Sequence, residues 1–267
     1  MVRYAAFHGR SMPRRDLPPV LIFDLDGTIL QINSFPLWVL FLIGGQLSTL
    51  GTRRRFALSV RSQVALARRK LRRTNHDEFL RELQLLWHEM SGSDGAMLAD
   101  RFAVDLLRRV RTNLNSTLRW VQSGEVDAIL ATAAAAEYAE GLGQRLGFRH
   151  IVATPANRRS GEPCNSGTSK RNRVFRLLAE RNWESRALIL FTDHADDVPL
   201  MQESCVVYWF GSTASLVQMA DAAPNAIIRP CLELDSESLC ATVRADHAAA
   251  PSERAEQAAE LREMTAS

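Results

Sequence analysis

The chain has 267 residues, of which 46% are hydrophobic and 24% are charged, a composition typical of a globular protein with a buried core. Its four cysteines form no closely spaced pair of the metal or redox type, and the N-terminus lacks the apolar core of a signal peptide, so we predict reduced thiols and a cytoplasmic location. The longest apolar run, residues 35–43, is shorter than the roughly 18 residues of a bilayer-spanning helix, so we predict no transmembrane segment.

The positive charge is concentrated in one segment. The whole chain has a net charge of +3, yet residues 33–115 carry fourteen Arg and Lys against seven Asp and Glu. That segment therefore has a net charge of +7, and the rest of the chain has −4 (3 − 7). Such a basic segment favours anionic ligands or surfaces.

Five short apolar runs predict the strands of a parallel sheet. The first, at residues 20–23, is wholly apolar, as expected for a strand buried on both faces. Similar runs recur at residues 126–132, 150–155, 187–193 and 205–211. Segments of helical composition at residues 133–146 and 169–181 alternate with these runs, which indicates an α/β fold with a Rossmann-like parallel sheet.

One connection is too long for a simple crossover. Residues 29–125 number 97 (125 − 29 + 1), whereas a strand-helix-strand crossover needs about a dozen. Amphipathic stretches in this interval predict helices at residues 53–71, 76–90 and 97–111. We therefore predict an all-helical cap domain, inserted at residues 33–115.

The insertion defines the other segments of the chain. The core domain comprises residues 20–32 and 116–232. Residues 1–19 are basic and contain proline without periodicity, so we predict a flexible leader. Residues 233–267 are rich in Ala, Glu and Ser, and we predict a tail that is either a frayed helix or disordered.

Two aspartates directly follow the first predicted strand. Asp24 and Asp26 are two residues apart, so in an extended chain they point to the same side, and Gly27 permits a sharp turn after them. Open α/β sheets bind ligands at the carboxyl ends of their strands. Carboxylates this close repel unless a cation lies between them or one binds a proton, and Mg²⁺ prefers such hard oxygen ligands. The pair therefore predicts either a site for a divalent cation or a carboxyl group that holds a proton, and both are chemically useful.

Further polar residues follow the other predicted strands. Asp193, Asp196 and Asp197 come directly after the fourth strand. Thr132 ends the second strand as a hydroxyl donor, and Lys170 begins a predicted helix, where it can reach a phosphate. A nucleophilic carboxylate, a carboxyl for proton transfer, a metal-binding acidic pair, a hydroxyl and a cation together suit phosphoryl transfer through an aspartyl-phosphate.

Taken singly, each of these signals has a structural alternative. Asp26 before a glycine is also typical of a turn. The acidic residues from Asp193 to Asp197 are also typical of a helix start, where they favour the helix dipole. Lys170 is also typical of a solvated surface lysine. Their conjunction at successive strand ends favours an active site.

The order of these segments resembles a known family. "DLDGT", Thr132 at a strand end, Lys170 and "TDHADD" are similar to the four motifs of the haloacid dehalogenase superfamily of phosphohydrolases. The resemblance covers about residues 20–211. In position and helical character, the predicted cap resembles the branch that includes phosphoserine phosphatases.

The resemblance implies a role for each motif residue. Asp24 would attack phosphorus, and Asp26 would protonate the leaving oxygen and then activate water. Dehalogenases of the superfamily lack this second aspartate, so Asp26 implies a phosphate ester as substrate. Thr132 and Lys170 would bind the transferring phosphoryl group. The ligands of Mg²⁺ would be Asp24, Asp26 through its backbone carbonyl, Asp193 and, directly or through water, Asp197.

Two departures from the family pattern stand out. The fourth motif usually begins Gly-Asp-Ser or Gly-Asp-Asn, whereas Thr192 and His194 flank Asp193 in this chain. Phosphoserine phosphatases carry a glutamate about nine residues after the nucleophile, where this chain has Asn33. The resemblance therefore implies a substrate other than phosphoserine.

The substrate class stays open between a small phosphorylated metabolite and a phospholipid head group. Residues 35–55 and 61–73 join an apolar segment to a basic one, a composition typical of a helix on an anionic membrane, and some helical-cap relatives act on phosphorylated lipids. Alternatively, a cap needs apolar helix faces in any case, and its arginines attract any anionic ester. No recognition motif or aromatic stacking platform accompanies the basic residues, so nucleic acid is not a predicted partner.

A second class of function is a non-catalytic scaffold. Such a protein would keep the fold and bind a phosphorylated ligand or a membrane without turnover. The presence of Asp24, Asp26, Lys170 and Asp193 favours the enzyme.

Overall fold

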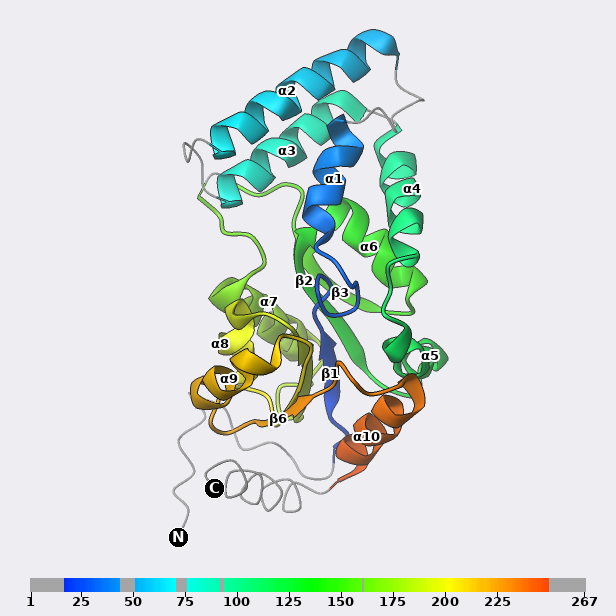
Figure 1. Cartoon of the computed structure of the whole chain (residues 1–267), viewed down its shortest axis with the longest axis vertical. Coiled ribbons are helices and arrows are strands. Elements are labelled where there is room, and N and C mark those ends of the chain that lie inside the picture. Colours follow the sequence, from blue (N-terminus) through cyan, green and yellow to red (C-terminus); the bar gives the residue numbers. More distant parts are fainter. Residues whose placement is uncertain (1–16, 44–50, 71–75, 92–93, 160, 250–267) are drawn as a thin grey trace.

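The computed structural model describes residues 17–43, 51–70, 76–91, 94–159 and 161–249. Within them lies a six-stranded sheet with the order β3-β2-β1-β4-β5-β6, in which every neighbouring pair is parallel (Figure 1). The strands are β1 (Val20–Phe23), β2 (Ala128–Ala135), β3 (His150–Thr154), β4 (Leu188–Thr192), β5 (Val206–Trp209) and β6 (Ile227–Pro230). The predicted Rossmann-like α/β fold is confirmed.

Helices cover both faces of the sheet. One layer consists of α5 (Asn115–Ser123), α6 (Ala136–Arg145) and α10 (Ser236–Ala248), and the other of α7 (Gly167–Glu180), α8 (Val198–Met201) and α9 (Leu216–Ala222). Successive residues of a strand face opposite sides. Along β1, Leu21 and Phe23 therefore pack into the first layer, and Val20 and Ile22 into the second. A strand between two helical layers must be apolar on both sides, as this one is.

Four α-helices of the described residues lie between β1 and α5 along the chain, and we call them the helical insert. They are α1 (Ser34–Ile43), α2 (Thr52–Lys70), α3 (His76–Ser91) and α4 (Gly95–Leu107), all within the predicted cap region. The insert shares the apolar core of the first helical layer. The ring centroid of Tyr138 on α6 lies 5.6 Å from that of Trp38 on α1 and 5.0 Å from that of Phe102 on α4. Among the described helices, none combines the length and the apolar character that a membrane crossing requires.

Several elements of the core differ from the prediction, among them β6 and α10. Strand β6 extends the sheet beyond the five predicted strands. Helix α10 occupies part of the region that was predicted to be a frayed helix or disordered tail. Its first turn is capped by Asp235, whose side chain accepts hydrogen bonds from the backbone N–H groups of Glu237 and Ser238. Leu239 and Val243, four residues apart, are buried in the core, so α10 is an integral part of the fold.

The first sixteen residues of the predicted leader and the last eighteen of the predicted tail lie outside the described residues.

Candidate active site

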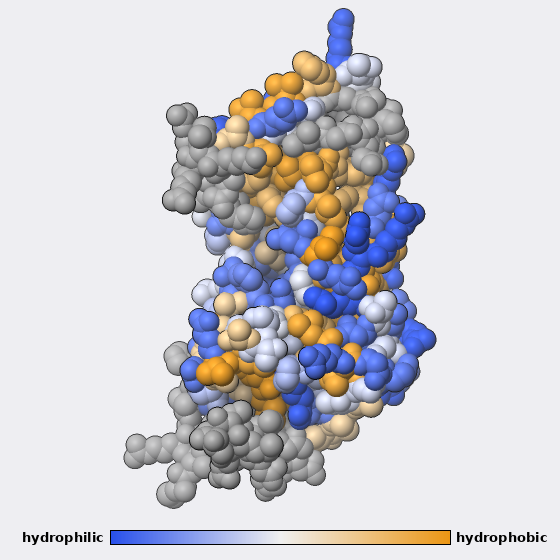
Figure 2. Space-filling view, viewed as in Figure 1, coloured by the Kyte–Doolittle hydropathy of each residue, from blue (hydrophilic) through white to orange (hydrophobic). Residues whose placement is uncertain are grey.

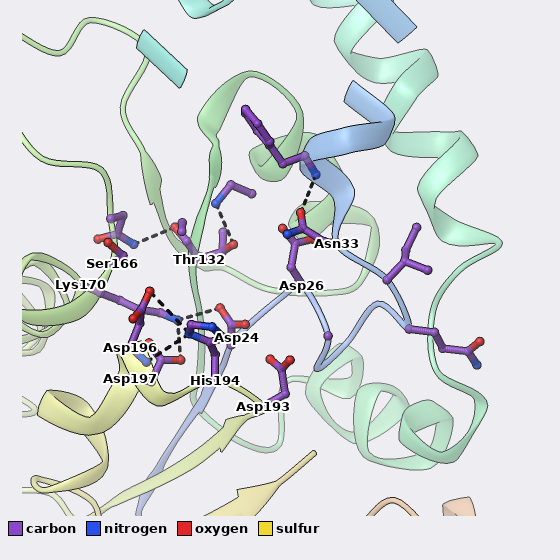
Figure 3. Close-up of a pocket in the computed structure, with 17 residues that line it drawn as sticks. Asp24, Asp26, Asn33, Thr132, Ser166, Lys170, Asp193, His194, Asp196 and Asp197 are labelled. Atoms are coloured by element: carbon purple, nitrogen blue, oxygen red, sulfur yellow. Dashed lines mark hydrogen bonds and ion pairs between the residues drawn. The ribbon is translucent and has the colours of Figure 1, made fainter. Parts of the chain in front are cut away.

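A cavity of about 440 Å³ lies at the carboxyl ends of β1, β2 and β4. The strand order reverses at β1, because β2 and β3 continue on one side and β4 to β6 on the other. Open α/β sheets bind ligands at such a reversal. The six predicted site residues all line this cavity (Figure 3): Asp24, Asp26, Thr132, Lys170, Asp193 and Asp197.

Lys170 lies at the centre of a buried charge cluster. Its Nζ donates to Asp24 Oδ1 at 2.7 Å and to Asp197 Oδ2 at 2.8 Å. The hydroxyl of Thr192 donates to the same oxygen of Asp197 at 2.7 Å. Burial acts to lower the pKa of Lys170, but the carboxylates of Asp197 and Asp24 override it and hold the pKa above its ordinary value. The lysine is therefore a fixed positive charge beside the predicted nucleophile.

Asp26 is held from the start of the helical insert. Its Oδ1 accepts a hydrogen bond of 2.9 Å from the backbone N–H of Ser34, the first residue of α1. Burial raises the pKa of Asp26 to about 6, and hydrogen bonds from Ser34 oppose that rise. A carboxyl group with this pKa can both give and take a proton near neutral pH.

The turn after β1 brings Asp193 close to the backbone. Gly27 has a φ of +75°, and a Cβ at this position would overlap the carboxylate of Asp193. The hydroxyl of Thr28 donates to Asp193 Oδ1 at 3.1 Å. The guanidinium of Arg111 also contacts this turn, and its Nη2 donates a hydrogen bond of 2.7 Å to the carbonyl oxygen of Gly27. Glycine is therefore needed at position 27 for its conformation and for its lack of a side chain.

Thr132 lies inside β2, which corrects the prediction that it ends the strand. The strand continues to Ala135, and its register against β3 shifts between Ala131 and Ala135. Such irregularities re-aim side chains at active sites. The side-chain amide of Asn165 donates to the carbonyl of Thr132 at 2.9 Å and to that of Val152 in β3 at 2.7 Å. Asn165 thus links the two strands where the regular pairing is interrupted.

The carboxyl groups that line the cavity outnumber the lysine beside them, and burial disfavours their ionised forms. Burial raises the pKa of Asp24 to about 8 although Lys170 acts to lower it, and burial also raises the pKa of Asp193. Among the described residues, no three acidic, histidine or cysteine side chains converge as a complete metal cage. Magnesium, however, commonly takes one or two protein carboxylates and keeps several waters. The hard oxygen donors fit such an ion, and its charge would favour their ionised forms.

The sequence also matches a known family. Residues 21–202 match the family described as haloacid dehalogenase-like hydrolase. The chain belongs to this family. A comparison of this hydrolase with curated proteins finds no match.

The fold of the hydrolase recurs in solved structures. A protein of unknown function from Bordetella pertussis Tohama I superposes with a TM-score of 0.63 at 20% identity, over 80% of this chain and 99% of the other. A structure described as a probable phosphoserine phosphatase from Vibrio cholerae, in unliganded form, superposes with a TM-score of 0.50 at 12% identity, over 79% of this chain and 67% of the other. At these identities the likeness concerns the fold alone.

The two departures in the fourth motif differ in their surroundings. Thr192 is fully buried and donates to Asp197, so it belongs to the charge cluster around Lys170. The side chain of His194 is 66% exposed, and its Nδ1 accepts a hydrogen bond of 3.1 Å from the backbone N–H of Asp196. His194 therefore organises the turn after β4 at the rim of the cavity.

Several residues that hold the site of this hydrolase were not predicted from the sequence. They are Thr28, Ser34, Arg111, Tyr138 and Asn165. A local signal existed for Thr28, which lies in the first motif, and for Ser34, a residue type common at helix starts, directly before an apolar run. The other three act over large separations in sequence, where local patterns carry no information about partners.

Proposed function

We propose that this hydrolase is a Mg²⁺-dependent phosphomonoesterase that works through an aspartyl-phosphate on Asp24. The observation that carries the proposal is the buried contact of 2.7 Å between Lys170 Nζ and Asp24 Oδ1. It sets a fixed cation beside a carboxylate at the edge of a cavity that Asp26 and Thr132 also line. A nucleophile, an acid–base group and two donors for phosphoryl oxygens then face one space.

The reaction has two steps on these residues. Asp24 attacks phosphorus, the bond between phosphorus and the leaving oxygen breaks, and Asp26 gives its proton to that oxygen. Water then attacks the phosphorus of the aspartyl-phosphate, Asp26 takes up the proton of the water, and inorganic phosphate leaves Asp24 free. Lys170 and the hydroxyl of Thr132 bind the phosphoryl oxygens, whose charge grows in both transition states.

The carboxylates of Asp24 and Asp193 and the backbone carbonyl of Asp26 would hold the magnesium ion. When bound, it would neutralise charge on the phosphoryl oxygens and favour the ionised form of Asp24. Asp197 Oδ2 accepts hydrogen bonds from both Lys170 and Thr192, so this carboxylate would fix the position of the Lys170 ammonium group.

The test is turnover of 4-nitrophenyl phosphate by the full chain, with Mg²⁺ and with a chelator in its place. We expect activity only with the metal, and a loss of at least about 10³-fold in Asp24→Asn. Asp221→Asn, the same change on the surface of α9, is the matched control and should keep the wild-type rate. The mechanism would be contradicted by equal rates with and without metal, or by an Asp24→Asn variant as fast as the wild type. Absence of turnover by folded protein would favour the non-catalytic scaffold.

A feature of the insert favours a phospholipid head group over a soluble metabolite as substrate. Phe56, Val60 and Val64 follow one another at intervals of four along α2, with exposed fractions of 72%, 41% and 52%. Figure 2 shows apolar surface over the helical insert. Exposed apolar side chains on a basic segment suit peripheral contact with an anionic membrane, from which a lipid phosphate could reach the cavity.

Co-sedimentation with phosphatidylglycerol vesicles at low salt tests this second proposal. We expect binding by the wild type and its loss in a Phe56→Ser/Val64→Ser variant. Val217→Ser, which removes a side chain that is 73% exposed on α9 of the core, should bind as the wild type does. Absence of wild-type binding would leave the small metabolite as the substrate class.

A further inference from the structure

The predicted acid–base group is connected to a tyrosine on another element. The backbone N–H of Ser34 donates to Asp26 Oδ1 at 2.9 Å, and Ser34 Oγ lies 2.8 Å from the phenolic oxygen of Tyr138. Both Ser34 and Tyr138 have no exposed surface. Ser34 begins α1 of the insert, whereas Tyr138 lies on α6 of the core, 104 residues further along the chain.

Two hydrogen bonds make this link. The backbone N–H of Ser34 donates to Asp26 Oδ1, and the Ser34 hydroxyl is paired with the phenolic hydroxyl of Tyr138, where either oxygen can be the donor. The side chain of Ser34 is therefore fixed by Tyr138 while its backbone holds Asp26. Burial raises the pKa of Tyr138 well above its ordinary value, which keeps the phenol protonated.

The position of Tyr138 depends on the insert. Its ring meets that of Phe102 from α4 edge to face at 5.0 Å and that of Trp38 from α1 at 5.6 Å. Such aromatic pairs favour a defined geometry. The ring of Tyr138 is therefore held by two insert helices while its hydroxyl points to the residue that holds Asp26.

We propose that Tyr138 is a positioning residue for Asp26, acting through Ser34, and that it makes proton transfer to the leaving group depend on the packing of the insert against α6. The proposal rests on the proposed function. When the bond between phosphorus and the leaving oxygen breaks, the proton of Asp26 passes to that oxygen and Asp26 becomes a carboxylate. The backbone hydrogen bond from Ser34 stabilises and orients that carboxylate, and the hydroxyl of Tyr138 fixes the position of Ser34.

A pair of aryl substrates separates this role from a structural one. Phenolate is a poor leaving group that needs a proton, whereas 4-nitrophenolate leaves readily without one. A defect in acid positioning therefore slows phenyl phosphate far more than 4-nitrophenyl phosphate, while a general loss of structure slows both equally. The value to compare is kcat/KM, which includes phosphoryl transfer to Asp24 and excludes the later attack of water.

We expect Tyr138→Phe to lower kcat/KM about tenfold for phenyl phosphate and less than about threefold for 4-nitrophenyl phosphate, a fraction of the 10²–10⁴-fold contribution of a general acid. Ser34→Ala keeps the backbone donor and removes the hydroxyl, so it should show the same selective loss and carries the test if Tyr138→Phe does not fold. Asp26→Asn should show the largest ratio between the two substrates. Tyr208→Phe, which removes a buried tyrosine hydroxyl bound to Asp246 on α10, is the matched control and should leave the ratio unchanged.

The outcomes distinguish the inference from the proposed function. Equal factors on both substrates in folded Tyr138→Phe and Ser34→Ala, with a large ratio in Asp26→Asn, would overturn the positioning role alone. An unchanged ratio in Asp26→Asn, or no magnesium-dependent turnover by the wild type, would overturn the proposed function and this inference with it.

Discussion

Ion pairs at the catalytic edge of the core and on the outer face of the insert have similar lengths and opposite surroundings. Lys170 and Asp197 lie 2.8 Å apart, and each side chain is only 3% exposed. Arg68 on α2 and Glu82 on α3 lie 3.1 Å apart, but their side chains are 52% and 31% exposed. The geometry is nearly the same, and the exposure to water is not.

The comparison teaches that burial, not distance, decides what a charge does in this protein. In water an ion pair gains little, because solvent competes for both partners and salt screens them. In the core each charge has lost its water, so each depends on its partner. Burial therefore shifts the pKa values of the side chains at the catalytic edge and makes them suitable for chemistry. The charged side chains on the outer face of the insert are hydrated by solvent whether or not they are paired.

The largest effect is expected for Lys170→Met. The substitution leaves Asp24 and Asp197 buried without their shared cation, and we expect the free energy of unfolding to fall by about 3–5 kcal/mol. Urea denaturation monitored by circular dichroism measures it. A change below about 1 kcal/mol would mean that burial does not distinguish the two regions in this way.

The second largest loss of stability is expected on removal of the buried, neutral hydroxyl of Tyr208. Tyr208 donates its hydroxyl to Asp246, and Tyr208→Phe should cost about 1.5–3 kcal/mol, since the acceptor is charged. Burial raises the pKa of Tyr208 above its ordinary value, so its contribution is fully present below about pH 10 and is lost as the pH rises further. Urea midpoints between pH 8 and pH 11 should therefore fall less steeply in the variant than in the wild type. Parallel curves would count against this assignment.

A backbone test follows at the turn after β1. Gly27→Ala meets both a φ of +75° and the carboxylate of Asp193, so we expect about 1–2 kcal/mol of lost stability and about a 100-fold loss of turnover. Gly161→Ala is a matched control, because its φ is +80° and its Cβ would meet nothing within 4 Å. The control should show the loss of stability alone. Equal turnover in the two variants would show that the fit of Asp193 against Gly27 does not matter.

The smallest effect is expected on the insert. Arg68→Gln removes the exposed pair with Glu82 and should change the free energy of unfolding by no more than about 0.5 kcal/mol, and by less at high salt. The same urea experiment at low and high salt measures it. If Arg68→Gln lowered the free energy of unfolding as much as Lys170→Met does, burial would not distinguish the ion pairs of the two regions.

Much of the fold and the site was predictable, because both follow from short-range patterns. A wholly apolar run such as residues 20–23 is recognisable as a buried strand wherever it packs. Polar residues directly after such strands meet at one edge of a parallel sheet, which is how Asp24 and Asp193 were expected to come together. Strand β6 was missed, and the region of α10 was expected to be only a frayed helix or a disordered tail. Strand β6 is four residues long, as β1 is, but it ends in Arg229 and Pro230 and so lacks a wholly apolar run. Helix α10 has a capping signal at Asp235 that was not used.

By itself, the amino-acid sequence determined the α/β class, the helical insertion and the six residues that line the cavity, since periodicity and motif order are properties of neighbours along the chain. Only the tertiary structure decided how those residues are held. Three features join segments that lie apart in the sequence: the irregular pairing of β2 with β3 around Thr132, the hydrogen bond from Arg111 to Gly27, and the link from Tyr138 to Asp26. Hydrogen bonds of this kind depend on where side chains come to rest after packing, and no local pattern records that position.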